Sequence, residues 1–146
     1  MLLLSECETE ADLHDIVYAI DLLTQAGKTV DAYCYCFKPS TDAPPHSAVR
    51  LLNRQDTDLT MRPKVAILKP FSRKHYDAVI DLTAGLCLPL RYLSLYANTS
   101  LRCGKDWGNF RIDIQNRQAS PDNASEPLSD RRYLLQQIIH YLQQFK

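Results

Sequence analysis

The chain has 146 residues, with 17 basic and 17 acidic side chains and a hydrophobic fraction of 45%. This length suffices for one domain with its own core, because a domain of about 150 residues buries roughly 68–70% of its unfolded surface. Zero net charge argues against binding to nucleic acid by phosphate neutralisation and against a polybasic membrane surface. We therefore expect residues 1–146 to form a single domain with no nucleic-acid or membrane partner.

The start of the chain lacks the pattern of a signal peptide. The apolar residues 1–4 are followed at once by Glu6 and Glu8, whereas a signal peptide has a basic start and a longer apolar stretch. No apolar run approaches the roughly 20 residues that span a bilayer. The sequence predicts a cytoplasmic protein, in which the five cysteines are reduced.

The first part of the chain alternates strands with one amphipathic helix. Residues 1–4 are a candidate first strand, and Thr9 and Asp12 have the spacing of a capping box at the start of the following helix. That helix carries an apolar stripe and is expected to stop at Gly27. Residues 29–37 are apolar on both faces, which is typical of a central parallel strand.

The middle of the chain contains a strand, helix and strand in succession. Residues 49–52 are a weak third strand, and 63–69 are predicted to form a short helix that ends at the next proline. Residues 78–82 form the fourth strand. Pro89 suits the first turn of a helix, and 100–103 form the fifth strand. This βαβ unit predicts a parallel sheet.

The last part of the chain adds an edge strand and a helix. Residues 110–114 alternate apolar and polar side chains, which is typical of a strand at a sheet edge. A final helix begins near Ser129. Its predicted buried face consists of five residues, Leu134, Ile138, Tyr141, Leu142 and Phe145.

Strands that alternate with helices predict an α/β fold. Right-handed crossovers then give a single three-layer, Rossmann-like domain with a mostly parallel sheet. We expect the strand order 3-2-1-4-5, with residues 110–114 added at an edge.

The turn after the first strand argues against a nucleotide cofactor. A dinucleotide site needs glycines there, so that backbone amides can approach the pyrophosphate. Residues 5–10 contain no glycine and three glutamates, and acidic groups at a helix N-terminus repel phosphate. No Walker-type loop occurs in the sequence. We therefore expect no cofactor, and no binding of nicotinamide dinucleotides or ATP.

Asp81 is the leading candidate for a ligand-binding residue. It lies at the carboxyl end of its predicted strand, where open α/β sheets bind ligands, and Thr83, Gly85 and Arg91 follow closely. The predicted site lies beyond the first and fourth strands. The acidic turn on its other side favours a neutral or cationic polar ligand over a bare phosphate. The alternative is that Asp81 caps its own turn and that Arg91 is solvated.

The cysteines suggest two further sites, and neither is well supported. Cys34 and Cys36 share one face of a strand, but structural zinc needs four ligands and the histidines show no matching pairs. Core packing explains them better, so no metal is expected. Cys87 near a helix N-terminus would need a histidine partner to act as a nucleophile. His75 is expected at the opposite end of the adjoining strand.

Trp107 is a candidate interaction residue. It lies in a loop between Gly104 and Gly108, and tryptophan is enriched at the energetic centres of interfaces. The alternative is that its ring covers the edge of its own sheet.

Short motifs along nearly the whole chain resemble those of a known family. They are Gly27-Lys28-Thr29-Val30, Arg62-Pro63-Lys64, Tyr76-Asp77, Ile80-Asp81-Leu82, Leu88-Pro89-Leu90-Arg91-Tyr92 and Cys103-Gly104. Together they resemble a family of small α/β proteins of anaerobic bacteria to which no activity is assigned. The resemblance implies a Rossmann-like fold and transfers no catalytic residue. The strand ending in Ile80-Asp81-Leu82 is also similar, more weakly, to the N-terminal domain of heptosyltransferase-like glycosyltransferases, which hold the sugar nucleotide mainly on a second domain.

Taken together, these patterns favour a non-enzymatic binding or interaction module, with a protein partner or self-association. The alternative is a small transferase- or hydrolase-like enzyme that uses the crevice at Asp81. An enzyme should bring an acid or base together with a second polar group at the strand ends. A binding module should instead expose an apolar patch.

Overall fold

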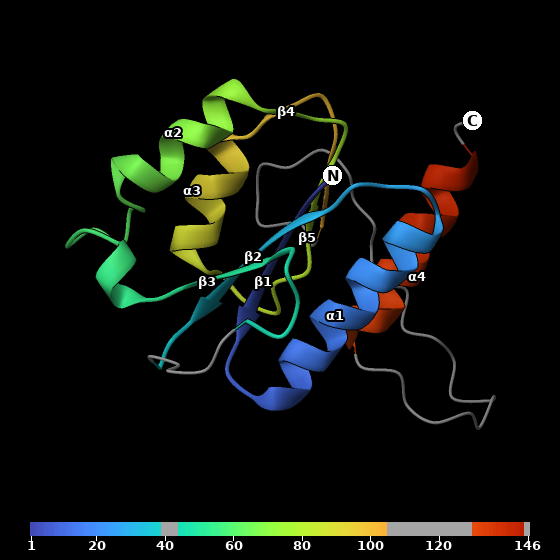
Figure 1. The fold of residues 1–146 in the computed structure, drawn as a ribbon, viewed down its shortest axis with the longest axis horizontal. Helices are drawn as coiled ribbons and strands as arrows, with labels where there is room; N and C mark the ends of the chain where they lie inside the picture. The colour runs from blue at the N-terminus through green and yellow to red at the C-terminus, as the bar shows by residue number, and fades with distance from the viewer. Residues whose placement is uncertain (39–43, 105–129, 145–146) are drawn as a thin grey trace.

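The computed structural model describes residues 1–38, 44–104 and 130–144. Five strands form a parallel sheet in the order β3-β2-β1-β5-β7 (Figure 1). The fold is α/β and Rossmann-like, and the predicted order of the five strands is confirmed. The predicted edge strand over 110–114 lies outside the described residues. The strands are β1 Leu2–Cys7, β2 Asp31–Cys36, β3 Val49–Leu52, β5 Val79–Asp81 and β7 Arg102–Gly104.

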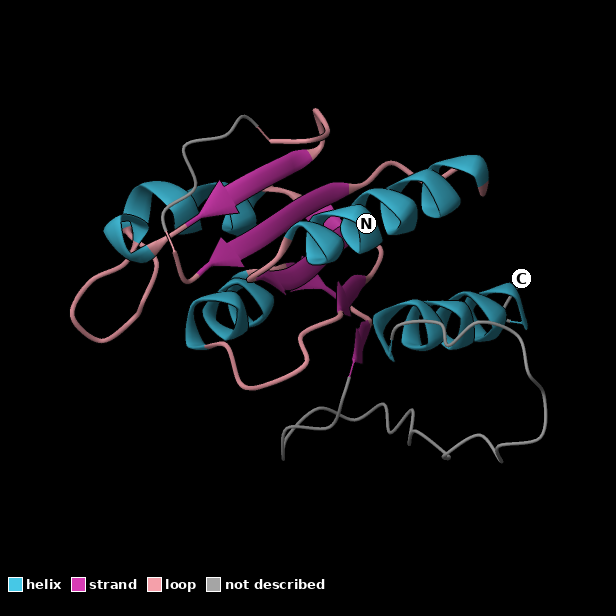
Figure 2. Cartoon of the chain, turned by 90° about the horizontal axis from the view of Figure 1, so that it is seen from below, coloured by secondary structure: helices cyan, strands magenta, loops and turns pink. Residues whose placement is uncertain are grey.

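Helices cover both faces of the sheet and complete three layers. Helices α1, Glu10–Gln25, and α4, Asp130–Gln144, lie side by side on one face (Figures 1 and 2). Helices α2, Val65–Arg73, and α3, Leu88–Tyr96, lie together on the other face. None of the helices in the described ranges is long and apolar enough to cross a membrane.

Alternation along the central strands divides the core into two layers. Leu3 of β1 and Cys34 of β2 pack in the cluster with the residues of α1 and α4. Leu4 and Tyr35 belong to the cluster with the residues of α2 and α3. Every residue of β1 is buried, and burial of one large apolar side chain contributes about 1.5–3 kcal/mol. Strand β1 is therefore central to both layers.

The caps of α1 confirm the predicted bounds. The Asp12 backbone N–H donates to Thr9 Oγ1, and the Thr9 N–H donates to Asp12 Oδ2, so the capping box is complete. After the last turn, Gly27 has a φ of 75°. Its N–H donates to the Thr24 carbonyl and the Lys28 N–H donates to the Leu23 carbonyl. This pattern is a Schellman motif, which needs a residue with positive φ.

Helix α2 continues through Pro70 to Arg73, so the prediction that it ends before this proline is wrong. Pro70 cannot donate to the carbonyl of Ala66, which would ordinarily end a helix. Both residues are exposed, so water can satisfy the freed carbonyl. The next residue, Phe71, is 1% exposed, and its burial holds the final turn against the sheet.

Two very short strands form a second parallel sheet that the sequence did not predict. Strand β4, His75–Tyr76, pairs with β6, Asn98–Thr99. They directly precede β5 and β7 in the chain, and a segment of two residues is too short to show a periodic pattern. A short 3-10 helix, Arg54–Asp56, is capped by Asn53 and follows β3.

Helix α4 packs on α1 and belongs to the core. Leu134 and Ile138 are buried, as predicted. The Arg132 Nε atom donates to Asp15 Oδ1 at 2.6 Å, and its guanidinium carbon lies 4.8 Å from the centre of the Tyr18 ring. The side chains at 141 and 142 and the whole of residue 145, which were also predicted to be buried, lie outside the described part of the chain.

Candidate ligand-binding site

A pocket of about 460 Å³ opens at the carboxyl ends of β1 and β5. Strand β1 pairs with β2 on one side and with β5 on the other, so the chain connections diverge here. Open α/β sheets bind ligands at this kind of switch point. The lining comprises four charged side chains, the turn after β5 and an apolar rim: Glu6, Glu8, Asp12, Arg131, Thr9, Ala84, Gly85, Leu86, Cys87 and Phe37.

Glu6 is the most informative residue of this pocket. It is only 8% exposed. Its Oε1 atom accepts a hydrogen bond from the Ala84 backbone N–H at 2.5 Å and lies 3.2 Å from Arg131 Nη2. Its Oε2 atom is buried and has no hydrogen-bond partner among the described residues. Buried polar atoms are nearly always paired, so this oxygen needs an explanation.

Arg131 brings the last helix into the site. Its guanidinium pairs with Glu6 through Nη2 and with Asp12 through Nη1. Burial raises the pKa of Asp12, but hydrogen bonds from the backbone amides of Glu8 and Thr9, together with the charge of Arg131, outweigh it and leave that pKa below its ordinary value. The pocket therefore holds an ionised Asp12 in a fixed pair with Arg131.

Asp81, the leading candidate from the sequence, lies beside this pocket and not among its lining residues. Its Oδ1 accepts a hydrogen bond from the backbone N–H of Thr83 at 3.0 Å, so it caps its own turn. Burial raises the pKa of Asp81; the charge of Glu6 adds to this, and Thr83 and Arg91 oppose it. The raised pKa indicates that the Asp81 carboxyl group is poorly solvated.

The other predicted site residues fall in different surroundings. Thr83 is buried, whereas Gly85 is exposed and lines the pocket. Arg91 is half-buried on α3, where its charge acts on Asp81. Trp107 lies outside the described residues. The structure thus brings Gly85 to the pocket and groups Asp81, Thr83 and Arg91 behind it.

All five cysteines are free and buried, and their environments disfavour thiolate chemistry. Burial raises the pKa of Cys87 to about 11 and that of Cys7 to about 12. Cys34 and Cys36 pack in the core beneath α1 and α4. Within the described ranges, no three side chains of the metal-binding types are grouped to hold an ion.

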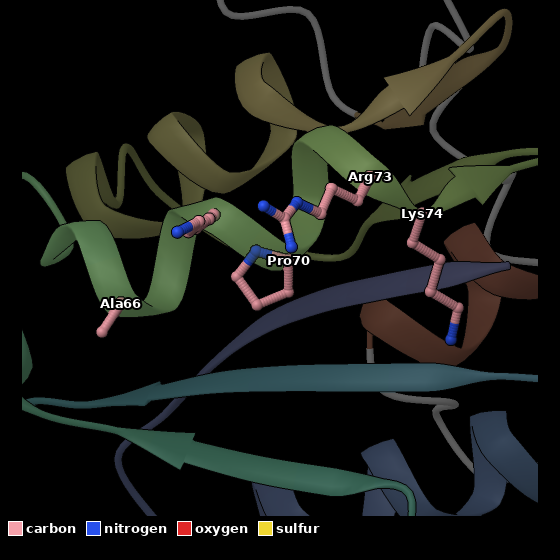
Figure 3. A pocket seen from close by; sticks show the side chains of 5 residues that line it. Ala66, Pro70, Arg73 and Lys74 are labelled. Carbon is pink, nitrogen blue, oxygen red and sulfur yellow. The ribbon is translucent and has the colours of Figure 1, made fainter.

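A second hollow, of about 610 Å³, lies beside α2 and is basic (Figure 3). Lys69 and Arg73 are exposed there, and Lys74 Nζ bonds Asp31 Oδ2 at 2.5 Å. Pro70, which lies within α2, also lines this hollow. No buried polar atom without a partner belongs to its described lining, so we interpret it as a solvated helix face.

Sequence reasoning missed Glu6 as the centre of the site and Arg131 altogether. In the sequence, Glu6 is part of an acidic turn that repels phosphate and favours a neutral or cationic ligand, and nothing there marks it as a buried carboxylate. Arg131 is distant in sequence and belongs to a helix whose position against α1 no local pattern reveals. The signal that was available is a glutamate near the end of a strand that begins with three leucines.

The chain matches known proteins only in the comparison with solved structures. Neither protein-family models nor curated proteins match the chain. Among solved structures, the chain is similar to E. coli heptosyltransferase WaaC with ADP, with 23% identity and a TM-score of 0.46 over 94% of this chain. The same enzyme with ADP-2-deoxy-2-fluoro heptose gives 20% identity and a TM-score of 0.46. The chain spans 46% and 48% of those two chains, and the likeness lends it no activity and no residue role.

Proposed function

We propose that this chain is a non-enzymatic, cytoplasmic domain that binds a small polar ligand in the pocket at Glu6. The observation that carries the proposal is the buried Oε2 atom of Glu6, which lacks a partner among the described residues. Leaving such an atom unpaired costs about 1–3 kcal/mol. A ligand that donates a hydrogen bond to it would recover that energy.

The form of the pocket supports this proposal. Its volume of about 460 Å³ falls in the range of small-molecule sites, which is roughly 300–1,000 Å³. Its lining combines charged side chains with the apolar side chains of Phe37 and Leu86, as in most such sites. Glu6 lies on a buried central strand, so the receiving group is held in place before a ligand arrives.

Three further polar side chains of the pocket are not available as a free acid, base or nucleophile, which favours binding over catalysis. Asp12 and Arg131 pair with each other, and the raised pKa of Cys87 keeps its thiol protonated. An enzyme would need an available acid or base and a second group acting with it.

One observation favours the alternative of a transferase- or hydrolase-like enzyme at the Asp81 crevice. The pKa of Asp81 is raised by burial and by its neighbour Glu6, and perturbed carboxyl groups are typical of catalytic acids. On this alternative, Asp81→Asn abolishes a reaction that Glu6→Gln leaves partly intact. Metabolite turnover assays on both variants distinguish the two functions.

A ligand-observed NMR screen tests the proposed function. A mixture of neutral, cationic and anionic polar fragments is screened against the wild type, Glu6→Gln and Asp21→Asn. Asp21 is exposed on α1 outside the pocket lining, so this control makes the same change in net charge. We expect at least one fragment to lose about tenfold or more in affinity with Glu6→Gln alone. A screen without any Glu6-dependent binder at millimolar concentration overturns the proposal.

A further inference from the structure

We infer that the ligand of this pocket is an organic cation, an amine attached to an apolar or aromatic body. Its ammonium group would bind Glu6 Oε2, and its body would lie against Phe37 and Leu86. This inference rests on the proposed function and narrows it to one class of ligand.

The charges of the pocket exclude an anion. Its lining contains three carboxylates, those of Glu6, Glu8 and Asp12, against the single guanidinium of Arg131. That guanidinium already pairs with Glu6 and Asp12. An incoming anion would therefore meet Glu6 Oε2 and the exposed Glu8 without a free cation in the described lining. A cation would be attracted by both.

The unpaired oxygen favours an ammonium over a neutral donor. A hydrogen bond between charged groups is roughly twice as strong as one between neutral groups. The attraction grows further where the surroundings exclude water, and Glu6 is 8% exposed. An ammonium also has several donors, so it can bond Oε2 while a second N–H remains directed to water or to Glu8.

The same pocket has an apolar wall that a bare inorganic ion would leave uncovered. Phe37 and Leu86 both line it, and they are 52% and 61% exposed. The Phe37 ring meets the buried Tyr35 ring edge-on, with the centres 5.3 Å apart, which fixes its place at the rim. A hydrocarbon or aromatic body that covers these side chains gains about 25 cal/mol for each Å² removed from water.

A divalent metal ion is a poorer occupant. Calcium takes six to eight oxygen ligands, whereas the carboxylate atoms Glu6 Oε1 and Asp12 Oδ1 both lie against the Arg131 guanidinium. A metal ion would have to displace Arg131 and then bind beside its charge. An ammonium needs only one oxygen, Glu6 Oε2, which has no hydrogen-bond partner among the described residues.

Three matched probes test the charge of the ligand. Benzylamine, benzyl alcohol and benzoate share one ring and differ in the charge of the polar group. Each is titrated at neutral pH and low salt against the wild type, Glu6→Gln and Asp21→Asn. We expect benzylamine to bind with millimolar affinity, at least about tenfold more tightly than benzyl alcohol, with benzoate weakest. Glu6→Gln should weaken benzylamine about tenfold or more, and Asp21→Asn should leave it unchanged.

A second variant keeps the test decisive if Glu6→Gln fails to fold. Phe37→Ser alters an exposed rim residue and retains the carboxylate. It should weaken benzylamine about threefold or more, because the ring loses its apolar contact, and leave methylamine binding unchanged. Thermal melting of each variant confirms that it is folded before titration.

The outcomes separate this inference from the function on which it rests. Benzyl alcohol or benzoate binding at least as tightly as benzylamine, with Glu6-dependence, overturns the cationic ligand and retains the binding function. Benzylamine affinity that survives both Glu6→Gln and Phe37→Ser also overturns the inference. The absence of any binding by the three probes overturns it as well, and the wider fragment screen then decides the proposed function.

Discussion

The Nη2 atom of Arg131 lies 3.2 Å from the Oε1 atom of Glu6, which ties the last helix to the first strand. The same guanidinium pairs with Asp12 at the start of α1. The side chains of Glu6 and Arg131 are only 10% and 12% exposed. One cation therefore pairs with two largely buried carboxylates in the lining of the pocket, and it also holds α4 against α1.

Removal of this cation should destabilise the protein strongly. Arg131→Met leaves Glu6 and Asp12 without their shared partner, and breaking a buried ion pair from one side costs about 3–5 kcal/mol. We expect the free energy of unfolding in urea to fall by about that amount. Arg132→Gln is the control, because Arg132 pairs with Asp15 at a more exposed position, with 35% of its side chain accessible. It should cost only about 1 kcal/mol, and equal losses for both variants would contradict this account.

Asp81→Asn should stabilise the protein at neutral pH. The pKa of Asp81 is raised in the folded state, mainly by burial, so the native protein binds a proton more tightly than the unfolded chain. The wild type therefore loses stability as the pH rises from about 4, the unfolded value, through the folded pKa. Asparagine still offers an Oδ1 atom that can accept the hydrogen bond from the Thr83 backbone N–H, and it does not ionise. In urea unfolding at pH 7, Asp81→Asn should have a higher free energy of unfolding than the wild type. At pH 4 this difference should disappear.

Asp12→Asn should behave in the opposite way. Hydrogen bonds from Glu8 and Thr9 and the charge of Arg131 outweigh burial and hold the pKa of Asp12 below its ordinary value. The stability that this charge contributes is present above about pH 4 and is lost as the pH falls through the folded pKa. The variant should be less stable than the wild type at pH 7, with a difference that shrinks in acid. A difference independent of pH would contradict the assigned charge.

Gly104 should tolerate no side chain. A Cβ atom there would lie 2.9 Å from both the Cβ and the carbonyl oxygen of Asp81, its partner across β5 and β7. Gly104→Ala should therefore force the two strands apart and cost about 1–3 kcal/mol, as overpacking usually does. At Gly85 the same addition meets nothing within 4 Å, so Gly85→Ala should leave the melting temperature nearly unchanged.

Helix α4 should contribute to the core and not only to the site. Ile138 is fully buried in the cluster shared with α1 and the sheet. Ile138→Ala should lower the free energy of unfolding by about 2–5 kcal/mol, since it removes a large buried side chain and leaves a cavity. The exposed Gln136 on the same helix provides the control. A small effect of Ile138→Ala, similar to that of Gln136→Ala, would show that α4 is only loosely attached.

The sequence predicted the parts of this fold that leave a periodic or local signal. These signals depend only on residues that are close in sequence. They are the apolar runs of β1 and β2, the capping box of Thr9 and Asp12, and the end of helix α1 at Gly27. Helix α2 was misjudged because the tolerance of Pro70 depends on the exposure of Ala66, which only the packed structure reveals. A pocket opens at the strand ends where the sequence predicted a ligand site, but the pairing of Glu6 with Arg131 depends on how α4 packs against α1.

The most direct test of the proposed site is the position of the benzylamine contact, mapped by amide chemical shifts in a ¹H–¹⁵N spectrum. The Ala84 N–H already bonds to Glu6 Oε1, and Gly85 lies on the lip of the pocket. Saturable shifts of the Ala84 and Gly85 amides on titration, absent in Glu6→Gln and unchanged in Asp21→Asn, are the predicted result. Shifts confined to Lys69 and Arg73 in the hollow beside α2, or no saturable shift at all, would contradict the assignment of the site to Glu6.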